Sequence, residues 1–265
     1  MDVSPFVKPQ LIKNHQQHNQ FFLYDSEIFP EFDVQVLTAD YWQQQNKVVG
    51  TAIGRGTTYF IAHQENQWVL RHYYRGGLIG KLINDGYLFT GLEKTRAFAE
   101  FNLLATMYQQ GLPVPKPIAC KVVKSGLVYR ADLLTARVEN ANDLVGILQE
   151  NAISDASWRH IGKMIAKFHL QGIYHHDLNS HNILIDNQDK PWLIDFDRGE
   201  QRMLPAGESK LAISQAKWPQ QNLARLLRSF EKEQDKLTTF HWQARDWQQL
   251  LNGYQQQLTV AVQCY

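Results

Sequence analysis

Hydrophobic residues along the chain change their spacing several times, and these changes predict the order of the elements. Residues 1–47 are polar, with Gln and His clusters and no strong period, so we expect a loosely structured lead-in with short elements at 26–32 and 40–45. The chain then changes to short runs of β-branched and aromatic residues, which are typical of strands. Two runs, 59–62 and 68–73, are separated by five polar residues and predict an antiparallel hairpin.

A helical period follows this β-rich part. Thr90 and Glu93 fit a capping box, in which a hydroxyl and a carboxylate bind the free amides at a helix start. Apolar residues then recur at helical spacing, at Ala97, Phe101, Leu104, Ala105 and Tyr108. Glu100 falls within this stripe. A carboxylate there is costly without a partner, so Glu100 either has one or lies at the stripe's edge and faces water.

The second half of the chain is predicted to be mainly helical. Strands are expected at 118–123 and 127–134, and the polar stretch 135–142 suits a connection between two lobes. A strong helical period runs from about 155 to 170, and the last 50 residues also show helical spacing. We therefore expect an α+β protein, β-rich first and α-rich second.

Composition narrows the class of protein. Apolar residues make up 44% of the 265 residues, which suits a globular chain, and 27 Lys and Arg balance 26 Asp and Glu. This balance argues against a dedicated nucleic-acid coat protein. Two distant cysteines, Cys120 and Cys264, exclude a disulfide framework and a cysteine-based zinc site. We find neither a signal-peptide pattern nor an apolar run of about 18 residues, so we expect an intracellular protein.

The candidate chemistry is concentrated between residues 175 and 197. Asp177 and Asn182 lie in a polar loop that enters an apolar strand, and a turn returns a second strand that ends at Asp195. If the two strands pair, Asn182 and Asp195 come side by side, with Asp177 close to both. Two oxygen ligands at one strand edge suit a hard cation such as Mg²⁺ bound together with phosphates. The remaining carboxylate is then available to orient a substrate hydroxyl.

This stretch resembles the protein-kinase-like superfamily. The catalytic loop H-x-D-L-x-x-x-N is matched by 175–182, and the metal-binding D-F-G is matched in part by 195–197. The separations of five residues from Asp177 to Asn182 and thirteen from Asn182 to Asp195 also agree. The resemblance implies a two-lobed kinase-like fold. Its N-lobe, 48–135, is an antiparallel sheet with one main helix, and its C-lobe, 136–265, is mainly helical.

The resemblance also assigns roles in the first half of the chain. Gly54 and Gly56 match the loop that covers the phosphates of ATP, and Glu100 matches the helix Glu that pairs with a strand cation. The cation at the expected place is Arg71 instead of the usual Lys, and Lys81 is a second candidate. The connection at 135–139 would receive adenine. The implied cofactors are ATP and Mg²⁺, the latter held by the loop Asn and the Asp after the hairpin.

Three departures from the superfamily pattern restrict the substrate. Asp197 replaces the glycine of D-F-G, so we expect less freedom at positive φ there. Asn179 replaces the Lys that usually follows the catalytic Asp by two residues. Only 70 residues follow Asp195 and no A-P-E segment is present, which leaves little room for peptide docking. A compact kinase of small molecules or glycans fits better than a protein kinase.

Two further stretches, Arg-His-Tyr-Tyr-Arg-Gly-Gly at 71–77 and Asn-Leu-x-Arg-Leu-x-Arg-Ser at 222–229, are absent from generic kinases. They closely resemble one family within the superfamily, the bacterial Kdo kinases (3-deoxy-D-manno-octulosonic acid kinases) of the lipopolysaccharide core kinase group. The resemblance implies ATP-dependent phosphorylation of the 4-hydroxyl of Kdo on a lipid A precursor. It also implies a peripheral place at the cytoplasmic face of the bacterial inner membrane.

Several basic residues are candidates for contacts with this anionic substrate and with the membrane surface: Arg75, Lys81, Arg198, Arg202, Lys210, Lys217, Arg225 and Arg228. For any single one of these residues, solvated surface charge is the better interpretation. No nucleic-acid or protein partner is implied. Two alternatives stay open: another small-substrate or atypical kinase (heptose, aminoglycoside or protein), and a pseudokinase that binds nucleotide without catalysis.

Overall fold

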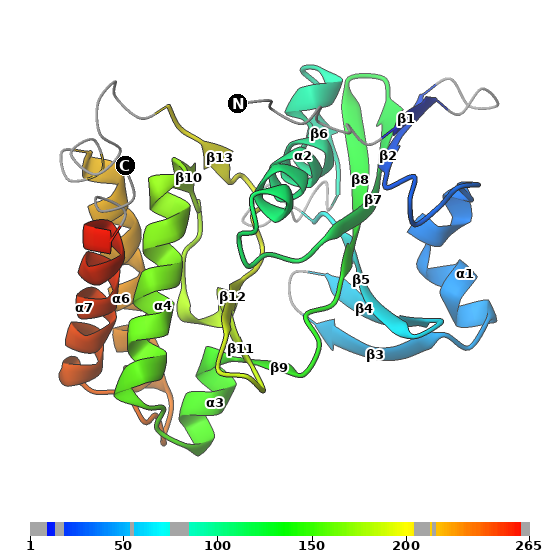
Figure 1. The fold of residues 1–265 in the computed structure, drawn as a ribbon. Helices are drawn as coiled ribbons and strands as arrows, with labels where there is room; N and C mark the ends of the chain where they lie inside the picture. Colours follow the sequence, from blue (N-terminus) through cyan, green and yellow to red (C-terminus); the bar gives the residue numbers. More distant parts are fainter. Residues whose placement is uncertain are drawn as a thin grey trace. The chain divides into compact units, whose positions relative to one another are not determined.

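The computed structural model describes residues 10–13, 19–53, 56–74, 85–203, 213 and 216–260, and Figure 1 shows the order of the elements. The chain forms two compact units. The first comprises residues 1–105 and 115–137, and the second comprises 106–114 and 138–265. Each unit is described separately.

The first unit is built on an eight-stranded antiparallel sheet. Its strand order is β1-β2-β7-β8-β5-β4-β3, with β6 paired to β8. The predicted hairpin is confirmed as β4–β5, and a second hairpin, β7–β8, follows from the alternating stretches near residues 118–134. The strands are β1 (Gln10–Lys13), β2 (Gln20–Tyr24), β3 (Val48–Ile53), β4 (Thr57–His63), β5 (Asn66–His72), β6 (Tyr87–Leu88), β7 (Pro117–Ser125) and β8 (Val128–Ala136).

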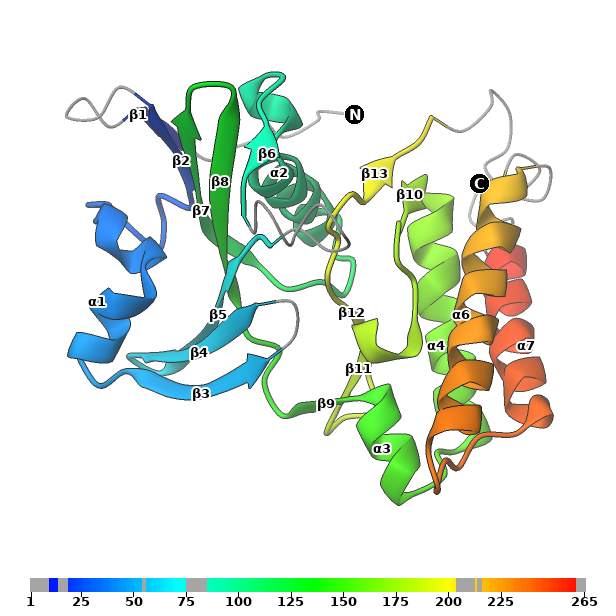
Figure 2. The same cartoon turned by 180° about the vertical axis from the view of Figure 1, so that it is seen from behind.

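The expectation of a loosely structured lead-in is wrong for the described part of residues 1–47. Strand β2 lies inside the sheet and pairs with β7. A short 3₁₀ helix (Val34–Leu37) and helix α1 (Ala39–Gln44) follow it and lie on the other face of the sheet from the long helix α2 (Figures 1 and 2). Phe22 and Trp42 are fully buried here, and Trp42 Nε1 donates to Val36 O at 2.8 Å. Because residues 1–47 are polar on average, their composition did not indicate this aromatic core.

Helix α2 (Arg96–Gln109) begins later than the capping box predicted. A 3₁₀ turn, Leu92–Lys94, occupies the predicted first turn. The buried stripe then follows Ala97, Phe98, Phe101, Leu104 and Met107, while Tyr108 is 45% exposed. The stripe passes from Leu104 to Met107, three residues later, so Tyr108, four residues later, lies outside it.

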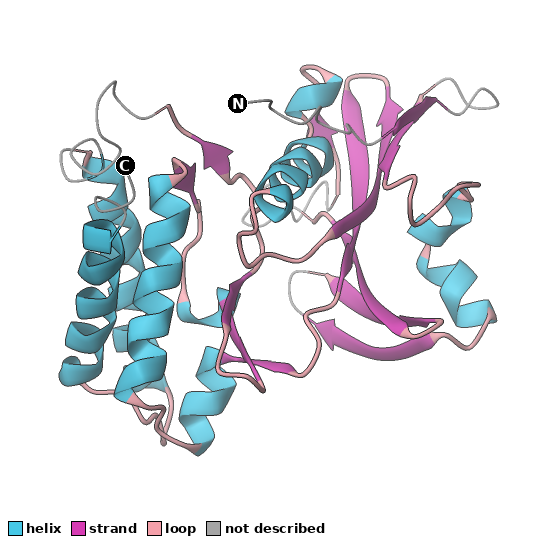
Figure 3. Cartoon of the chain, viewed as in Figure 1, coloured by secondary structure: helices cyan, strands magenta, loops and turns pink. Residues whose placement is uncertain are grey.

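The second unit is mainly helical, as Figure 3 shows, and its two small sheets frame the candidate loop. Helix α4 spans the predicted residues, is capped by Ser154, and buries the predicted face with Trp158 and Ile161. The helices are α3 (Leu144–Glu150), α4 (Asp155–Leu170), α6 (Lys217–Lys236) and α7 (Ala244–Val260). The strands are β9 (Ala141–Asp143), β10 (Ile173–Tyr174), β11 (Ile183–Asp186), β12 (Pro191–Leu193) and β13 (Glu200–Gln201).

Helices α4 and α7 pack closely because glycines lie at their contact. A methyl group at Gly162 would overlap the backbone of Leu250, and one at Gly253 would overlap the backbone of Arg159. Backbone atoms cannot move aside as side chains can. The two units together give the predicted α+β class, with an antiparallel sheet and one long helix in the first and mainly helices in the second.

Candidate active site

The hairpin β11–β12 joins the two predicted metal ligands. Ile183 pairs with Leu193 across the hairpin, and one step further Ile194 N–H donates to Asn182 O at 3.0 Å. Asn182 therefore lies beside the residue that precedes Asp195. The predicted juxtaposition at this end of the hairpin is confirmed.

His175 fixes the loop to the same end of the hairpin. Its ring is buried, Nε2 lies 3.0 Å from Ile194 O, and Nδ1 lies 3.2 Å from the amide nitrogen of Asp177. Burial lowers the pKa of His175, so the ring is neutral at pH 7. A neutral ring that donates from Nε2 and accepts at Nδ1 satisfies both contacts. His175 thus holds the backbone on either side of the site.

Two amide side chains hold the backbone of Asp177. Asn182 Nδ2 donates to Asp177 O at 2.9 Å, and Asn179 Nδ2 donates to the same oxygen at 3.0 Å. Asn179 Oδ1 accepts from His181 N and Asn182 N, which caps the short 3₁₀ helix Ser180–Asn182. Asn179, which departs from the superfamily pattern, is therefore a structural cap of the loop. The Asp177 side chain remains about half exposed.

The segment after β12 does not need the glycine that Asp197 replaces. The positive φ angles here belong to Asp195 (63°) and Arg198 (61°), and Asp197 is not among the residues with positive φ. Aspartate tolerates the left-handed region better than most residues. The expected loss of conformational freedom at Asp197 is therefore wrong for this backbone.

The donor set at the hairpin end suits a hard cation. The Asn182 amide is oriented by its own donated bond to Asp177 O, which leaves Oδ1 as an acceptor, and the side chain is largely buried. Asp195 supplies a carboxylate. The described part of the chain holds no cluster of three or more His, Cys, Asp and Glu side chains of the kind that binds a metal by itself. A cation here would take its other ligands from phosphate and water oxygens, as Mg²⁺ commonly does.

In the first unit, Glu100 has a partner, so the alternative that it faces water is wrong. Its side chain is buried, and Oε1 lies 2.5 Å from Arg71 Nη2 while Oε2 accepts from the Tyr73 hydroxyl at 2.6 Å. Arg71 and Tyr73 share one face of the extended segment, and His72 between them contacts Asp132 at 2.7 Å. The predicted Arg71–Glu100 pair is confirmed; its contact with ATP stays a prediction.

The glycine-rich stretch is described only in part. Gly54 and the alternative cation Lys81 lie outside the described residues. At Gly56, a methyl group would overlap the ring of Tyr74, so packing alone favours glycine there. Its contact with phosphate stays a prediction.

Helix α6 contributes contacts that the sequence did not reveal. Asn222 Nδ2 donates to His175 O at 3.0 Å, and Asn222 Oδ1 accepts from His175 N at 3.3 Å. Ser229 Oγ accepts from Ser180 N at 2.9 Å. The signal was the Asn-Leu-x-Arg-Leu-x-Arg-Ser stretch, whose polar residues lie three and four apart on one helix face.

Among the described residues of the basic set singled out by charge, Arg225 reaches the catalytic loop. Arg225 Nη1 lies 3.1 Å from Asp177 Oδ1. Arg202 instead pairs with Glu200 and lies over the Tyr174 ring, 3.7 Å from its centroid. Arg75 and Lys210 lie outside the described residues, as does Lys81. For Arg198, Lys217 and Arg228, contact with substrate stays a prediction.

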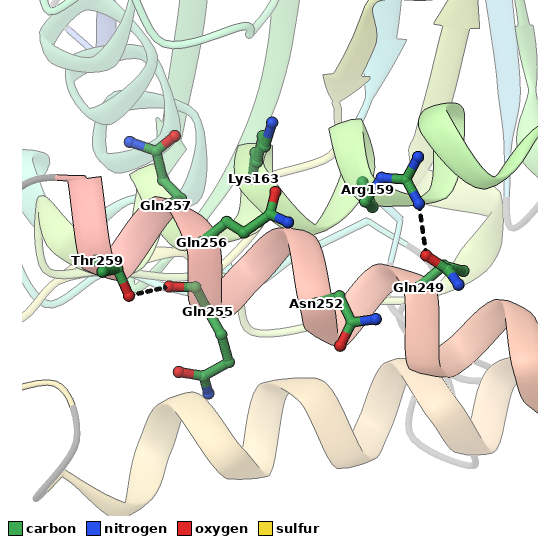
Figure 4. A pocket seen from close by; sticks show the side chains of 8 residues that line it. All are labelled: Arg159, Lys163, Gln249, Asn252, Gln255, Gln256, Gln257 and Thr259. Carbon is green, nitrogen blue, oxygen red and sulfur yellow. Dashed lines mark hydrogen bonds between the residues drawn. The ribbon is translucent and has the colours of Figure 1, made fainter.

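A groove of about 840 Å³ lies along α4 and α7, away from these residues (Figure 4). Arg159 Nη1 donates to Gln249 Oε1 across it at 2.6 Å. None of the predicted site residues lines it. The lining is polar: Arg159, Lys163, Gln249, Asn252, Gln255, Gln256, Gln257 and Thr259.

The loop and hairpin of the second unit, and the pairing of Arg71 with the buried Glu100 in the first, define a protein of the protein-kinase-like class. Comparison with known proteins gives the family. The chain belongs to the lipopolysaccharide kinase (Kdo/WaaP) family, whose model matches residues 39–254. This match spans most of both units and includes Arg71, Glu100, Asp177, Asn182, Asp195 and Asn222.

Several curated relatives share almost half of their residues with this chain over the matched region. The 3-deoxy-D-manno-octulosonic acid kinase of Vibrio parahaemolyticus is 48% identical over 89% of this chain and 94% of its own length. The enzyme of the same name from Vibrio cholerae is 49% identical over 84% and 90%, and that from Haemophilus influenzae strain PittEE is 44% identical over 92% and 100%. Among solved structures, the Cydia pomonella granulovirus kinase PK-1 is similar with a TM-score of 0.41 at 14% identity, over 62% and 55% of the two chains.

Proposed function

We propose that this chain transfers the γ-phosphoryl group of ATP to the 4-hydroxyl of a Kdo residue on a Kdo-lipid A precursor. The observation that carries the proposal is the geometry of Asp177, Asn182 and Asp195 at one hairpin end. The names of the relatives, all 3-deoxy-D-manno-octulosonic acid kinases, support the acceptor sugar. The choice of the 4-hydroxyl rests on the resemblance to that family.

Asp177 acts on the acceptor. Its half-exposed carboxylate is the group that orients the sugar hydroxyl and accepts its proton. As the hydroxyl oxygen forms its bond to the γ-phosphorus, the bond between that phosphorus and the bridging oxygen breaks, and ADP leaves with the electron pair. His175, Asn179 and Asn182 keep the Asp177 backbone in place throughout.

Asn182 and Asp195 would hold Mg²⁺, which neutralises phosphate charge when it is bound. Arg71, fixed by the buried Glu100, would steady the α- and β-phosphates. Gly54 and Gly56 would let the backbone approach the phosphates.

The place of action follows from the acceptor. A Kdo-bearing lipid A precursor is anchored in a membrane, so the enzyme must meet an anionic surface. No helix in the described residues is long and apolar enough to cross a bilayer. We propose peripheral attachment to the cytoplasmic face of the bacterial inner membrane.

Phosphate transfer from radiolabelled ATP tests the function directly. Purified protein, Mg²⁺ and ATP are incubated with a Kdo-bearing lipid A precursor or with the same lipid without Kdo. We expect label on the Kdo-bearing lipid alone. Label on both lipids would show that a group other than Kdo is the acceptor, and label on neither would refute the proposed activity.

The variant Asp177→Asn tests the assigned base, with Asp235→Asn, an exposed carboxylate on α6, as the matched control. Loss of a general base typically lowers the rate about 10²–10⁴-fold. We expect that loss for Asp177→Asn with the affinity for nucleotide unchanged, and wild-type turnover for the control. Turnover retained by Asp177→Asn would remove Asp177 from the mechanism.

A further inference from the structure

Helix α6 presents three polar side chains to the catalytic loop. Asn222 binds the backbone of His175 at both its N–H and its C=O, and Ser229 accepts from the backbone of Ser180. Arg225 lies between them in sequence and reaches the carboxylate of Asp177. Contacts on either side of Arg225 therefore fix the position of its Cα atom relative to the loop.

The loop itself carries no permanent cation. Residues 175–182 contain neither Lys nor Arg. Burial lowers the pKa of His175, which keeps that ring neutral. His181 points to two acidic partners, Asp143 at 3.6 Å and Glu233 at 3.3 Å. Asn179 is occupied as the cap of the loop.

Phosphoryl transfer needs positive charge near the acceptor. The transition state spreads negative charge over the equatorial oxygens of the transferring group, and fixed cations beside it supply much of the catalysis. The acceptor hydroxyl must reach Asp177 in order to lose its proton. A cation 3.1 Å from the Asp177 carboxylate is therefore next to the position where the new bond forms.

We propose that Arg225 is a catalytic residue that stabilises the transferring phosphoryl group, supplying from helix α6 the charge that the loop lacks. In the absence of substrate, Arg225 is held by Asp177. When the phosphoryl group approaches the acceptor oxygen, the planar guanidinium donates to its equatorial oxygens while staying beside the carboxylate. This role rests on the proposed function, because it requires phosphoryl transfer at Asp177.

The first test separates turnover from binding. Arg225→Gln keeps a polar side chain of similar reach without the charge, and Lys232→Gln, two turns further along α6, removes an exposed positive charge as the matched control. Removal of one transition-state donor costs about 10²–10³-fold in rate. We expect that loss in kcat for Arg225→Gln, little change in either KM, partial recovery in Arg225→Lys, and wild-type kinetics for Lys232→Gln.

The second test needs no acceptor. Calorimetry compares the binding of ADP and Mg²⁺ with and without fluoroaluminate, which is a planar anion that stands for the transferring group. We expect wild type to bind ADP more tightly when fluoroaluminate is present. Arg225→Gln should bind ADP and Mg²⁺ normally but lose this gain.

Three results would overturn the role of Arg225. A wild-type gain from fluoroaluminate in Arg225→Gln would show that the guanidinium does not touch the transferring group. A raised KM for the lipid with unchanged kcat would make Arg225 a contact to the acceptor. An unchanged kcat with unchanged KM would leave it without a role. If wild type transfers no phosphate to the Kdo-bearing lipid, the proposed function fails, and the calorimetry still tests Arg225 on its own.

Discussion

The variant Asn222→Leu tests whether α6 holds the catalytic loop. Asn222 is 1% exposed, and its amide satisfies both the N–H and the C=O of the buried His175. Leucine has nearly the same size, so it removes these two hydrogen bonds and leaves little cavity. Two buried backbone groups then lack partners in a place that water cannot reach.

The magnitude follows from those two groups. A buried polar group left without a partner costs about 1–3 kcal/mol, so the pair gives roughly 2–6 kcal/mol before relaxation. Relaxation of the loop toward water recovers part of this, and we expect a loss of ~3 kcal/mol in the free energy of unfolding. At roughly 2–4 °C per kcal/mol for a chain of this size, Tm falls by about 6–12 °C.

Urea denaturation followed by tryptophan fluorescence measures the loss, with Gln221→Leu at the neighbouring exposed position as the control. The control should stay within about 0.5 kcal/mol of wild type. If Asn222→Leu does the same, the two hydrogen bonds do not stabilise the loop, and the account of α6 as its support is wrong. A loss of stability with full kcat would show that the loop is held by its other contacts.

Three further predictions concern other parts of the chain. Gly162→Ala should lose about 1–3 kcal/mol in urea denaturation, because the new methyl group meets the backbone of α7; wild-type stability would contradict that contact. The neighbouring carboxylates of Asp143 and Glu233 raise the pKa of His181, so its stabilising charge is present at low pH and lost as the pH rises through that raised pKa. The stability difference between wild type and His181→Gln, less than about 1 kcal/mol for this half-exposed pair, should therefore shrink above pH ~6.5; a constant difference would refute the ion pair. Glu100→Gln should raise the KM for ATP about tenfold, equivalent to ~1.4 kcal/mol, because Arg71 is no longer held in place by a carboxylate. An unchanged KM would show that the Arg71–Glu100 pair does not contribute to ATP binding.

Elements with strong periodicity could be predicted from the sequence. The alternation near residues 59–73 and the helical spacing of 155–170 correspond to β4–β5 and α4, because both patterns are long and each element buries one face in the core of its own unit. The start of the chain could not be predicted. Phe22, Phe29 and Trp42 belong to one buried cluster, but polar residues interrupt its members at irregular intervals, so no helical or strand period in the sequence shows it.

In the candidate site too, local sequence patterns predicted some residues and not others. Residues 177, 182 and 195 could be found because a short loop and one hairpin bring them together, and local spacing fixes that geometry. Asn222 is 47 residues away from the His175 that it binds. The polar residues spaced three and four apart mark one face of α6, but this spacing does not show that Asn222 is buried against a loop so far away in the sequence. The pair Arg71–Glu100 is an intermediate case. The sequence alone showed that Glu100 needs a partner, and only the resemblance to kinases identified that partner as Arg71.

Helix α6 connects the core of the second unit to the chemistry. Phe230, one residue after Ser229, is fully buried, stacks on Trp242 at 5.6 Å and meets Trp158 edge to face at 5.5 Å. The residues of α6 that bind the catalytic loop, Asn222 and Ser229, and the residue that fills the core, Phe230, therefore lie within the same few helical turns. Because a packed core resists gradual deformation, a change in the core that shifts α6 must also shift Arg225 against Asp177. Stability and turnover should thus be lost together when the α6 core is altered, whereas an Arg225 variant should lose turnover alone.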